Sequence, residues 1–383
     1  RQAQAANIRV TEIYPLTLFA IAGMLLFPVA TDLITLFVAL EVLSLPLYLM
    51  AGLARRRRLA SQEAALKYFL LGAFASAFFL FGVAYLYGYS DSITFAGIAS
   101  AISGGSANDV FLLIGISFVS VGLLFKVGAV PFHSWTPDVY QGSPTSVTMF
   151  LSTVPKIAAV ALLVRLLIDG LGNFQQYWAD LFMILAVLSI AVGSLVALTQ
   201  VNIKRMLAYS TISHVGFVLL GFMTGVLEGY GSAVFYVLAY ILMSLAAFGS
   251  IIALNRNGFE ADQVSDFKGL SKHSPWFALI MLVVMLSMAG VPPFIGFYSK
   301  LFILQQVISE GYVILAVVAV IFAVISAYYY LQVIKTMYFD ESDKEIIVSA
   351  PIDVKVVLSL NGILILIIGL MPSFWMNLSV SLF

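Results

Sequence analysis

Three lysines lie deep within apolar stretches that are long enough to cross a membrane: Lys126, Lys156 and Lys300. A lysine at the centre of a bilayer costs roughly 2.5–3.5 kcal/mol on insertion scales, so side chains of this kind are normally kept for a function. One carboxylate, Glu41, lies at a similar depth in another apolar stretch. Buried ionisable groups in membrane proteins typically mark a path for charge or protons. The sequence therefore predicts a proton pathway along these four side chains.

Two further groups, Lys67 and His214, are weaker candidates for a relay. Lys67 lies near the end of its stretch, where a long side chain can instead extend to the membrane surface. His214 could exchange protons near neutral pH, although a hydrogen-bonded structural histidine is the simpler interpretation. For the deep lysines the alternative is the same extension to the surface, and for Glu41 it is a hydrogen bond from a protonated acid in helix packing.

Prolines interrupt two of the apolar stretches close to these lysines. The five-residue pattern Gly-x-x-Pro-Phe occurs at 128–132 and again at 290–294. Proline removes a backbone donor and clashes with the preceding turn, and in lipid the freed carbonyls must be met by protein or water. Each break is thus expected to border a hydrated cavity near a lysine. If Glu41 lay about 7 Å from Lys126, their coupling of roughly 2.4 kcal/mol would act as a proton switch.

The composition determines the class of protein that must position these groups. The chain is 62% hydrophobic and only 10% charged, whereas soluble domains average about 25% charged residues. About 20 apolar residues span a bilayer, and this length predicts an all-α polytopic membrane protein with about eleven transmembrane helices. The predicted spans are 12–30, 32–53, 63–88, 109–138, 144–168, 176–199, 203–226, 228–254, 275–308, 311–338 and 352–381.

The spans group into two units with matching breaks. Residues 12–168 and 176–338 each contain five spans, and the fourth span of each unit carries the Gly-x-x-Pro-Phe pattern. An odd number of spans makes the second unit inverted relative to the first, an organisation typical of transporters with an ion site near the midplane. The span at 352–381 remains as a C-terminal helix.

Charge fixes the expected orientation. Threading the spans alternately places fourteen of the nineteen Lys and Arg residues on or near one side, and the loops at 89–108, 169–175, 225–229 and 309–311 on the other side contain none. By the positive-inside rule the basic side is cytoplasmic. We therefore expect a multi-pass membrane protein whose basic side faces the cytoplasm.

Several chemistries are excluded from the chain itself. It contains no cysteine, so it offers no disulfide, no thiolate zinc site and no cysteine-ligated iron–sulfur cluster. Neither a Gly-x-Gly-x-x-Gly pattern nor a P-loop is present, and no dinucleotide or nucleotide-phosphate site is predicted. Redox chemistry, if it occurs, is expected in other subunits.

The residues around the candidate groups resemble subunit N of bacterial respiratory complex I, the proton-pumping NADH:quinone oxidoreductase. The resemblance covers nearly the whole chain, and its most specific part is the string at 131–144. The matching segments are 40–48 (LEVLSLPLY), 63–68 (EAALKY), 125–126 (FK), 131–144 (PFHSWTPDVYQGSP), 203–214 (IKRMLAYSTISH) and 296–300 (GFYSK).

The resemblance implies roles for the candidate residues. Glu41 would pair with Lys126, Lys156 would link two half-channels, and Lys300 would lie next to the exit side; Lys67 and His214 fall on family positions with less defined roles. The family has fourteen helices, so three are expected before residue 1. The resemblance implies no cofactor in this chain, with FMN, iron–sulfur clusters and quinone in partner subunits, and no contact with nucleic acid. The implied partners are the other membrane-arm subunits, the lipid bilayer, protons and water.

Four alternatives are considered at this point. The sister subunit M shares the architecture but tends to carry glutamate where Lys300 stands, and subunit L ends in a long lateral helix that is not evident after residue 381. An Mrp-type cation/proton antiporter subunit would exchange ions without NADH. An inactive structural scaffold would tolerate neutralisation of the buried lysines.

Overall fold

The computed structural model describes residues 10–54, 58–104, 109–255, 260–341 and 350–383, and these residues contain helices and no β-strand. Ten helical segments among them are long and apolar enough to cross a membrane. The helices of the first half are α2 (Val10–Leu26), η1 (Phe27–Val29), α3 (Leu33–Ala51), α4 (Arg58–Ser90), α5 (Phe95–Gly104), α6 (Val110–Val127), α7 (Trp135–Gly142), α8 (Thr145–Arg165), η2 (Leu166–Gly170) and η3 (Gly172–Phe174). Those of the second half are α9 (Gln175–Ala197), α10 (Ile203–Met223), α11 (Leu227–Leu254), η4 (Val264–Phe267), α12 (Leu270–His273), α13 (Pro275–Ala289), α14 (Ile295–Ser309), α15 (Val313–Tyr338), α16 (Ile352–Leu370) and α17 (Pro372–Val380).

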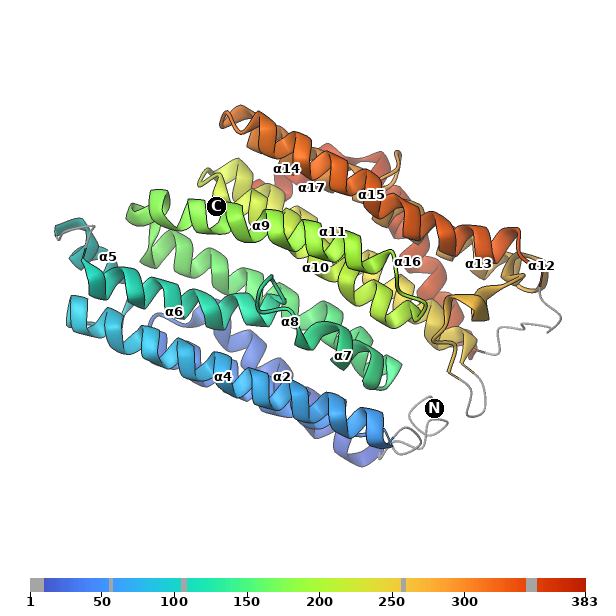
Figure 1. Ribbon diagram of the computed structural model, residues 1–383, viewed down its shortest axis with the longest axis horizontal. Coiled ribbons are helices and arrows are strands. Elements are labelled where there is room, and N and C mark those ends of the chain that lie inside the picture. Colours follow the sequence, from blue (N-terminus) through green and yellow to red (C-terminus); the bar gives the residue numbers. More distant parts are fainter. Residues whose placement is uncertain (1–9, 55–57, 105–108, 256–259, 342–349) are drawn as a thin grey trace.

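The long helices lie side by side, with α2 and α4 at one edge of the molecule and α14 and α15 at the other (Figure 1). Helix α10 is central, and 94% of its span residues are buried, against 22% for the span formed by α2 and η1. It packs mainly on α9 and α11, while α11 also packs on α8. The middle of the molecule is therefore shielded from lipid on all sides, which is where polar groups must lie if they are to be kept from hydrocarbon.

Every predicted span corresponds to a helix or to a pair of helices, and the prediction of an all-α polytopic membrane protein is confirmed. The fourth predicted span is α6 followed by α7, and the ninth is α13 followed by α14. Two features differ from the prediction. The loop predicted at 89–108 contains helix α5, and the last predicted span is divided at Pro372 into α16 and α17. Pro372 begins α17 because its missing N–H is not needed in a first helical turn.

Side chains and glycines fix where the central helices begin and end. Asp32 caps α3 by accepting hydrogen bonds from the amides of Ile34 and Thr35, and Asn202 caps α10 through the amide of Arg205. Helix α6 ends at Gly128 (φ 78°) and α13 ends at Gly290 (φ 88°). Both glycines adopt the left-handed conformation that terminates helices and that other residues adopt only at a cost.

The two halves of the chain share further details. Asp32 pairs with Thr94 in an isolated antiparallel bridge, and Asn202, which caps the second helix of the other half, pairs in the same way with Gln263. The peptide bonds Val130–Pro131 and Pro292–Pro293 are both cis. We propose that residues 12–168 and 176–338 are the two inverted repeats expected from the sequence; the matching caps, bridges and helix breaks support this division.

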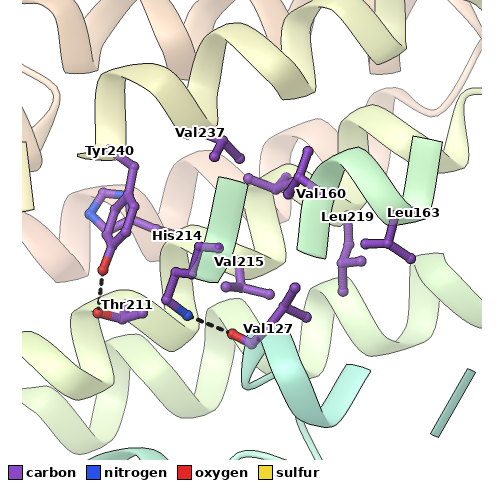
Figure 2. A pocket seen from close by; sticks show the side chains of 11 residues that line it. Val127, Val160, Leu163, Thr211, His214, Val215, Leu219, Val237 and Tyr240 are labelled. Atoms are coloured by element: carbon purple, nitrogen blue, oxygen red, sulfur yellow. Dashed lines mark hydrogen bonds between the residues drawn. The ribbon is translucent and has the colours of Figure 1, made fainter. Parts of the chain in front are cut away.

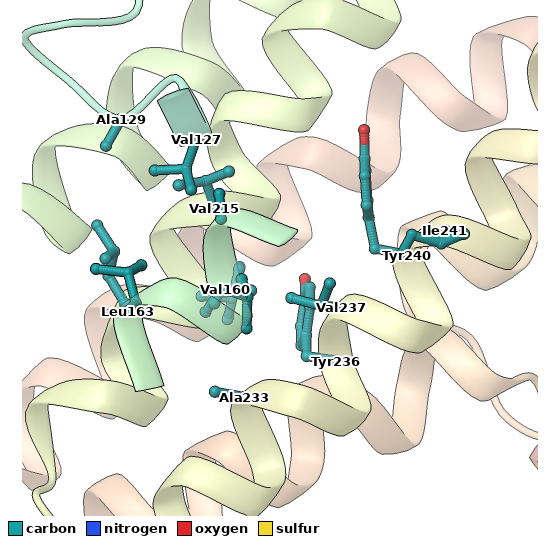
Figure 3. Packing of buried hydrophobic residues seen from close by; sticks show 14 of the residues in the cluster. Val127, Ala129, Val160, Leu163, Val215, Ala233, Tyr236, Val237, Tyr240 and Ile241 are labelled. Atoms are coloured by element: carbon teal, nitrogen blue, oxygen red, sulfur yellow. The ribbon is translucent and has the colours of Figure 1, made fainter. Parts of the chain in front are cut away.

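The apolar core surrounds the first helix break. Val127 and Ala129 at the end of α6 pack beside Val160 of α8, Val215 of α10 and Val237 of α11 (Figure 3). Four helices thus meet where α6 stops, so the polar atoms exposed by the break are enclosed by protein rather than by lipid.

Candidate functional site

Lys126 is held by two hydroxyl groups of the neighbouring helix α3. Its Nζ donates hydrogen bonds to Ser44 Oγ (2.6 Å) and to Tyr48 Oη (3.2 Å), and it lies 5.5 Å from the centre of the Tyr48 ring. Ser44 Oγ donates in turn to the Leu40 carbonyl. Lys126 is in the last turn of α6, immediately before the helix break. The ammonium is therefore bound by groups that can both accept and donate protons.

Glu41 lies on the same face of α3, one turn before Ser44. Its Oε1 accepts a hydrogen bond from Ser76 Oγ of α4 at 2.5 Å. Side chains three and four positions apart on a helix are neighbours, so Glu41, Ser44 and Tyr48 form one polar row opposite Lys126. The pairing of Glu41 with Lys126 stays a prediction, because the carboxylate is held by Ser76 and the ammonium by the two hydroxyls.

Lys156 lies on the other side of the break. It is 4% exposed, and its Nζ donates a 2.7 Å hydrogen bond to the carbonyl of Val127, the residue that follows Lys126. The last carbonyls of a helix have no partner within the helix and carry partial negative charge. The end of α6 thus supplies Lys156 with its hydrogen-bond acceptor. This acceptor belongs to the residue that directly follows Lys126 in the chain.

A small cavity lies between α8, α10 and α11 beside the end of α6, and Figure 2 shows side chains that line it. Its volume of about 20 Å³ is enough for roughly one water molecule. The polar side chains around it are Lys156, Thr211, His214 and Tyr240, and the rest of the lining is apolar. Thr211 Oγ1 and Tyr240 Oη lie 2.7 Å apart. The surface open to the cavity is apolar, so Lys156 and His214 border it through carbon atoms while their nitrogens are hydrogen-bonded elsewhere.

His214 is 5% exposed and has a tyrosine on each ring nitrogen. Nδ1 lies 2.7 Å from Tyr236 Oη, and Nε2 lies 3.2 Å from Tyr330 Oη, which is itself 2.5 Å from Ser210 Oγ. A neutral imidazole donates through one nitrogen and accepts through the other. Because each tyrosine hydroxyl can take either role, this row of hydrogen bonds can reverse its direction without any change in position.

Lys300 lies at the second helix break and is 8% exposed. Its Nζ donates to the carbonyls of Met288 (2.9 Å) and Ala289 (3.1 Å), which end α13. The same Nζ lies 5.6 Å from the centre of the Phe217 ring, and that ring stacks on Tyr236 at 5.9 Å between centres. Phe217 and Tyr236 thus lie between Lys300 and His214. Like Lys156, Lys300 donates its hydrogen bonds to carbonyls at the end of a helix.

Lys67 lies elsewhere, in a partly exposed ion cluster. Its Nζ contacts Glu63 (2.8 Å) on α4 and Asp138 (2.7 Å) on α7. Asp138 also accepts a hydrogen bond from Arg205 at 2.6 Å. The structure therefore separates Lys67 from the row that leads through the deep lysines and His214, and its role as a relay stays a prediction.

Several groups of the site were not predicted as site residues. Ser44 and Tyr48 follow Glu41 at helical spacing, so the sequence contained a signal for them. No pattern indicated Tyr236 or Tyr330, because their contacts with His214 join different helices: Tyr236 lies on the next helix, α11, and Tyr330 lies on α15. Lys204, which was counted with the cations on or near the basic side, is fully buried; its Nζ donates to the Ser143 carbonyl at 3.0 Å.

The profile of the family described as NADH:quinone oxidoreductase/Mrp antiporter, transmembrane, matches residues 30–326. A protein of Ruthia magnifica described as NADH-quinone oxidoreductase subunit N is 60% identical over 375 residues, which are 97% of this chain and 77% of the relative. The proteins with the same description from Thioalkalivibrio sulfidiphilus and Nitrosomonas europaea are each 50% identical, over 98% and 97% of this chain and 78% and 77% of their own lengths.

Solved structures give the same fold. A chain of respiratory complex I from Thermus thermophilus with bound aureothin is 36% identical with a TM-score of 0.83, over 96% of this chain and 79% of its own. A chain of the archaeal membrane-bound sulfane sulfur reductase is 29% identical with a TM-score of 0.84, over 96% and 74%. A chain of the Mrp complex from Dietzia has a TM-score of 0.86 over 99% and 80%, but at 23% identity it shows similarity of fold alone.

Proposed function

The chain belongs to the family of NADH-quinone oxidoreductase subunit N, and from this premise we propose that its buried lysines and hydroxyls form the route along which protons move. It is an antiporter-like, proton-translocating membrane-arm subunit of respiratory complex I, and it lies in a bacterial inner membrane as a multi-pass protein. Electron transfer in other subunits would drive the proton movement.

The observation that carries the proposal is the row of protonatable groups that crosses the middle of the molecule. It runs from Glu41 and Lys126 past Val127 to Lys156. The cavity lined by Lys156 and His214 separates these two groups, and His214 is hydrogen-bonded to Tyr236. The Phe217 ring lies between Tyr236 and Lys300 and carries no proton, so transfer to Lys300 would require water beside that ring. Such an arrangement within a lipid-shielded core is difficult to explain by packing alone, because each buried ammonium is costly.

Both broken helices contribute hydrogen-bond acceptors to this route. Lys156 and Lys300 each donate to carbonyls that end a broken helix, and those carbonyls can accept from a protonated or a neutral amine. A displacement of α6 or α13 would alter the stabilisation of the corresponding ammonium through the helix dipole. We propose that this is how a conformational change driven by electron transfer is converted into proton release and uptake.

We further propose that the chain carries no redox centre of its own. The absence of cysteine removes the usual ligands for iron–sulfur clusters, and the chemistry of FMN, iron–sulfur clusters and quinone would belong to partner subunits. The partners are the other membrane-arm subunits and the lipid bilayer. The naming of the relatives as subunit N favours this function over an Mrp-type antiporter or the sister subunit M.

The test is Lys126→Ala in the assembled complex, measured in inverted membrane vesicles at equal amounts of complex. NADH-driven quinone reduction and proton uptake, followed with a pH-sensitive dye, are both expected to fall sharply, because Lys126 joins the Glu41 row to Lys156. A matched control is Lys335→Ala, which removes a surface lysine paired with Asp340 and is expected to have no effect. Normal pumping by intact Lys126→Ala complex would instead support the structural scaffold.

A further inference from the structure

Asp138 on α7 joins three helices at the end of the molecule where α7 lies. Its two carboxylate oxygens accept from different cations: Lys67 of α4 at 2.7 Å and Arg205 of α10 at 2.6 Å. The same NH1 of Arg205 donates to Gln141 Oε1 of α7 at 3.1 Å. We refer to Asp138, Lys67 and Arg205 as the Asp138 node. The node connects α10, in the second half of the chain, to two helices of the first half.

A second contact strengthens the attachment of α7 to α10. Lys204 precedes Arg205 in the first turn of α10, is fully buried and donates from Nζ to the Ser143 carbonyl at 3.0 Å. Ser143 directly follows the last residue of α7 and caps that helix, and a cation at the C-terminal end of a helix is favourable. The first turn of α10 therefore holds α7 both at its middle and at its end.

The node also lies beside the side chains that surround Lys126. Trp135, one turn before Asp138 on α7, donates from Nε1 to the Phe125 carbonyl at 3.0 Å, and Phe125 precedes Lys126. Its ring stacks on Tyr68 at 4.5 Å between centres, and Tyr68 meets the ring of Tyr48 edge-on at 4.6 Å.

This connection is short in sequence as well as in space. Tyr68 follows Lys67, and the Tyr48 hydroxyl accepts from Lys126. Movement of α7 or α4 against α10 would therefore change the position of the groups that bind Lys126, because densely packed side chains transmit displacement.

We propose that Asp138 is a positioning residue for Lys126, and that the Asp138 node ties the placement of this lysine to the second half of the chain. This inference rests on the proposed function, since it concerns how Lys126 is set for proton transfer. Asp138 itself stays ion-paired and takes no proton in the cycle. The effect is geometric: the carboxylate fixes α7 between α4 and α10, and α7 fixes Trp135 and Tyr68 around the lysine.

Asp138 occupies the position in the first broken segment that Lys300 occupies in the second, and this correspondence supports a functional role for Asp138. Asp138 follows Pro131 by the same interval as Lys300 follows Pro293. In the second segment the side chain turns back onto the preceding helix end, whereas in the first it contacts α4 and α10. Both broken segments thus carry an ionisable group at the same sequence interval after the proline. Lys300 lies inside the proposed route, and Asp138 lies between the two halves of the chain.

The experiment compares Asp138→Asn, Arg205→Gln and the double variant in the assembled complex. The readout is NADH-driven proton uptake in inverted vesicles divided by the amount of assembled complex, and this quotient is the ratio referred to below. Each single variant is expected to lower coupled proton uptake by up to about fivefold, the upper end for losing a partly exposed ion pair that acts on a rate. The double variant is expected to be no worse than the single ones, because both remove the same contact. Asp138→Glu is expected to restore most of the loss.

The matched control is Asp169→Asn, which breaks the partly exposed Arg165–Asp169 pair of 2.8 Å away from the site and is expected to leave the ratio unchanged. A purely structural role for Asp138 would lower the amount of assembled complex while the ratio stays normal, and that result would overturn the proposal. Should Asp138→Asn fail to assemble, Arg205→Gln decides: it removes the cation from the other side of the same contact, and an unchanged ratio would equally overturn the proposal.

Lys126→Ala is measured in parallel to separate the two proposals. If Lys126→Ala abolishes pumping while the node variants pump normally, only the positioning role is lost. If Lys126→Ala pumps normally, the proposed function fails whatever the node variants do.

Discussion

Replacement of Lys156 by methionine separates the pathway from the packing. Lys156→Met keeps a flexible chain of similar length that fills the same space, but it removes the ammonium that contacts the Val127 carbonyl. Loss of a charge-assisted hydrogen bond costs about 1.5–3 kcal/mol. Removal of a buried charge offsets this, because desolvation of an ion costs several kcal/mol. The stability of the complex is therefore expected to change by no more than about 1–2 kcal/mol.

The effect on proton movement should be much larger. Without Lys156 a proton must pass between Lys126 and the cavity near His214 with no side chain to bind it, across apolar surroundings. An unpaired charge in such surroundings costs roughly 2.5–3.5 kcal/mol on insertion scales, which corresponds to roughly 70- to 400-fold in rate. We expect coupled proton uptake to fall by this factor.

The assay is NADH-driven proton uptake in inverted vesicles, normalised to the amount of assembled complex, with thermal stability of the purified complex measured alongside. Lys335→Met is the control, since the Lys335 side chain is 65% exposed and pairs with Asp340 at the surface. A Lys156→Met complex that is as stable as the wild type and pumps with the wild-type ratio would refute the reasoning that Lys156 carries the proton.

Three other substitutions test separate parts of the site. Gly290→Ala should destabilise the complex by about 1–2 kcal/mol because of its positive φ, and should also reduce pumping, since the added Cβ would lie 3.1 Å from Lys300 Cδ; unchanged thermal stability would contradict this. Glu41→Gln keeps a hydrogen-bonding partner for Ser76 but loses the charge, so vesicle pumping should fall while assembly is normal; equal pumping would mean that the charge is not used. Asp32→Ala removes the α3 cap and should lower stability by about 1 kcal/mol near neutral pH. Burial raises the pKa of Asp32, but hydrogen bonds from Thr35 and Ile34 lower it below the ordinary value of 3.8. The stability contributed by the Asp32 cap is therefore present above pH 3.8 and is lost as the pH falls through the lower pKa of the folded protein. Chemical unfolding across this pH range should show the stabilities of the wild type and the variant converging on acidification.

The span prediction succeeded where hydrophobic length decides the structure. In α6 and α13 the sequence also indicated the breaks, because glycine and proline act locally on the backbone. It did not indicate α5, whose ten residues are too few to span a membrane, nor the division before Pro372 within an otherwise continuous apolar stretch.

The site was predictable only in part for a related reason. The apolar sequence around Lys126, Lys156 and Lys300 showed that placing these lysines in a membrane costs free energy. Residues kept at such a cost indicate a functional site. The partners of those residues were not identifiable, because Lys156 and Lys300 bind backbone carbonyls, which every residue carries. Asp138 was equally inconspicuous, since its importance comes from two cations that lie far away in the sequence.

The use of helix ends as partners for Lys156 and Lys300 has a consequence for how each site behaves on losing its proton. A carboxylate partner would be left as an unpaired buried anion, and the surroundings would have to rearrange to accommodate it. A carbonyl remains neutral, and a neutral amine still has hydrogens to donate to it. Each lysine can therefore alternate between charged and neutral forms in one geometry. No counter-charge on the carbonyl partner neutralises the change, so the change in electrostatic potential acts on the next ionisable group of the row.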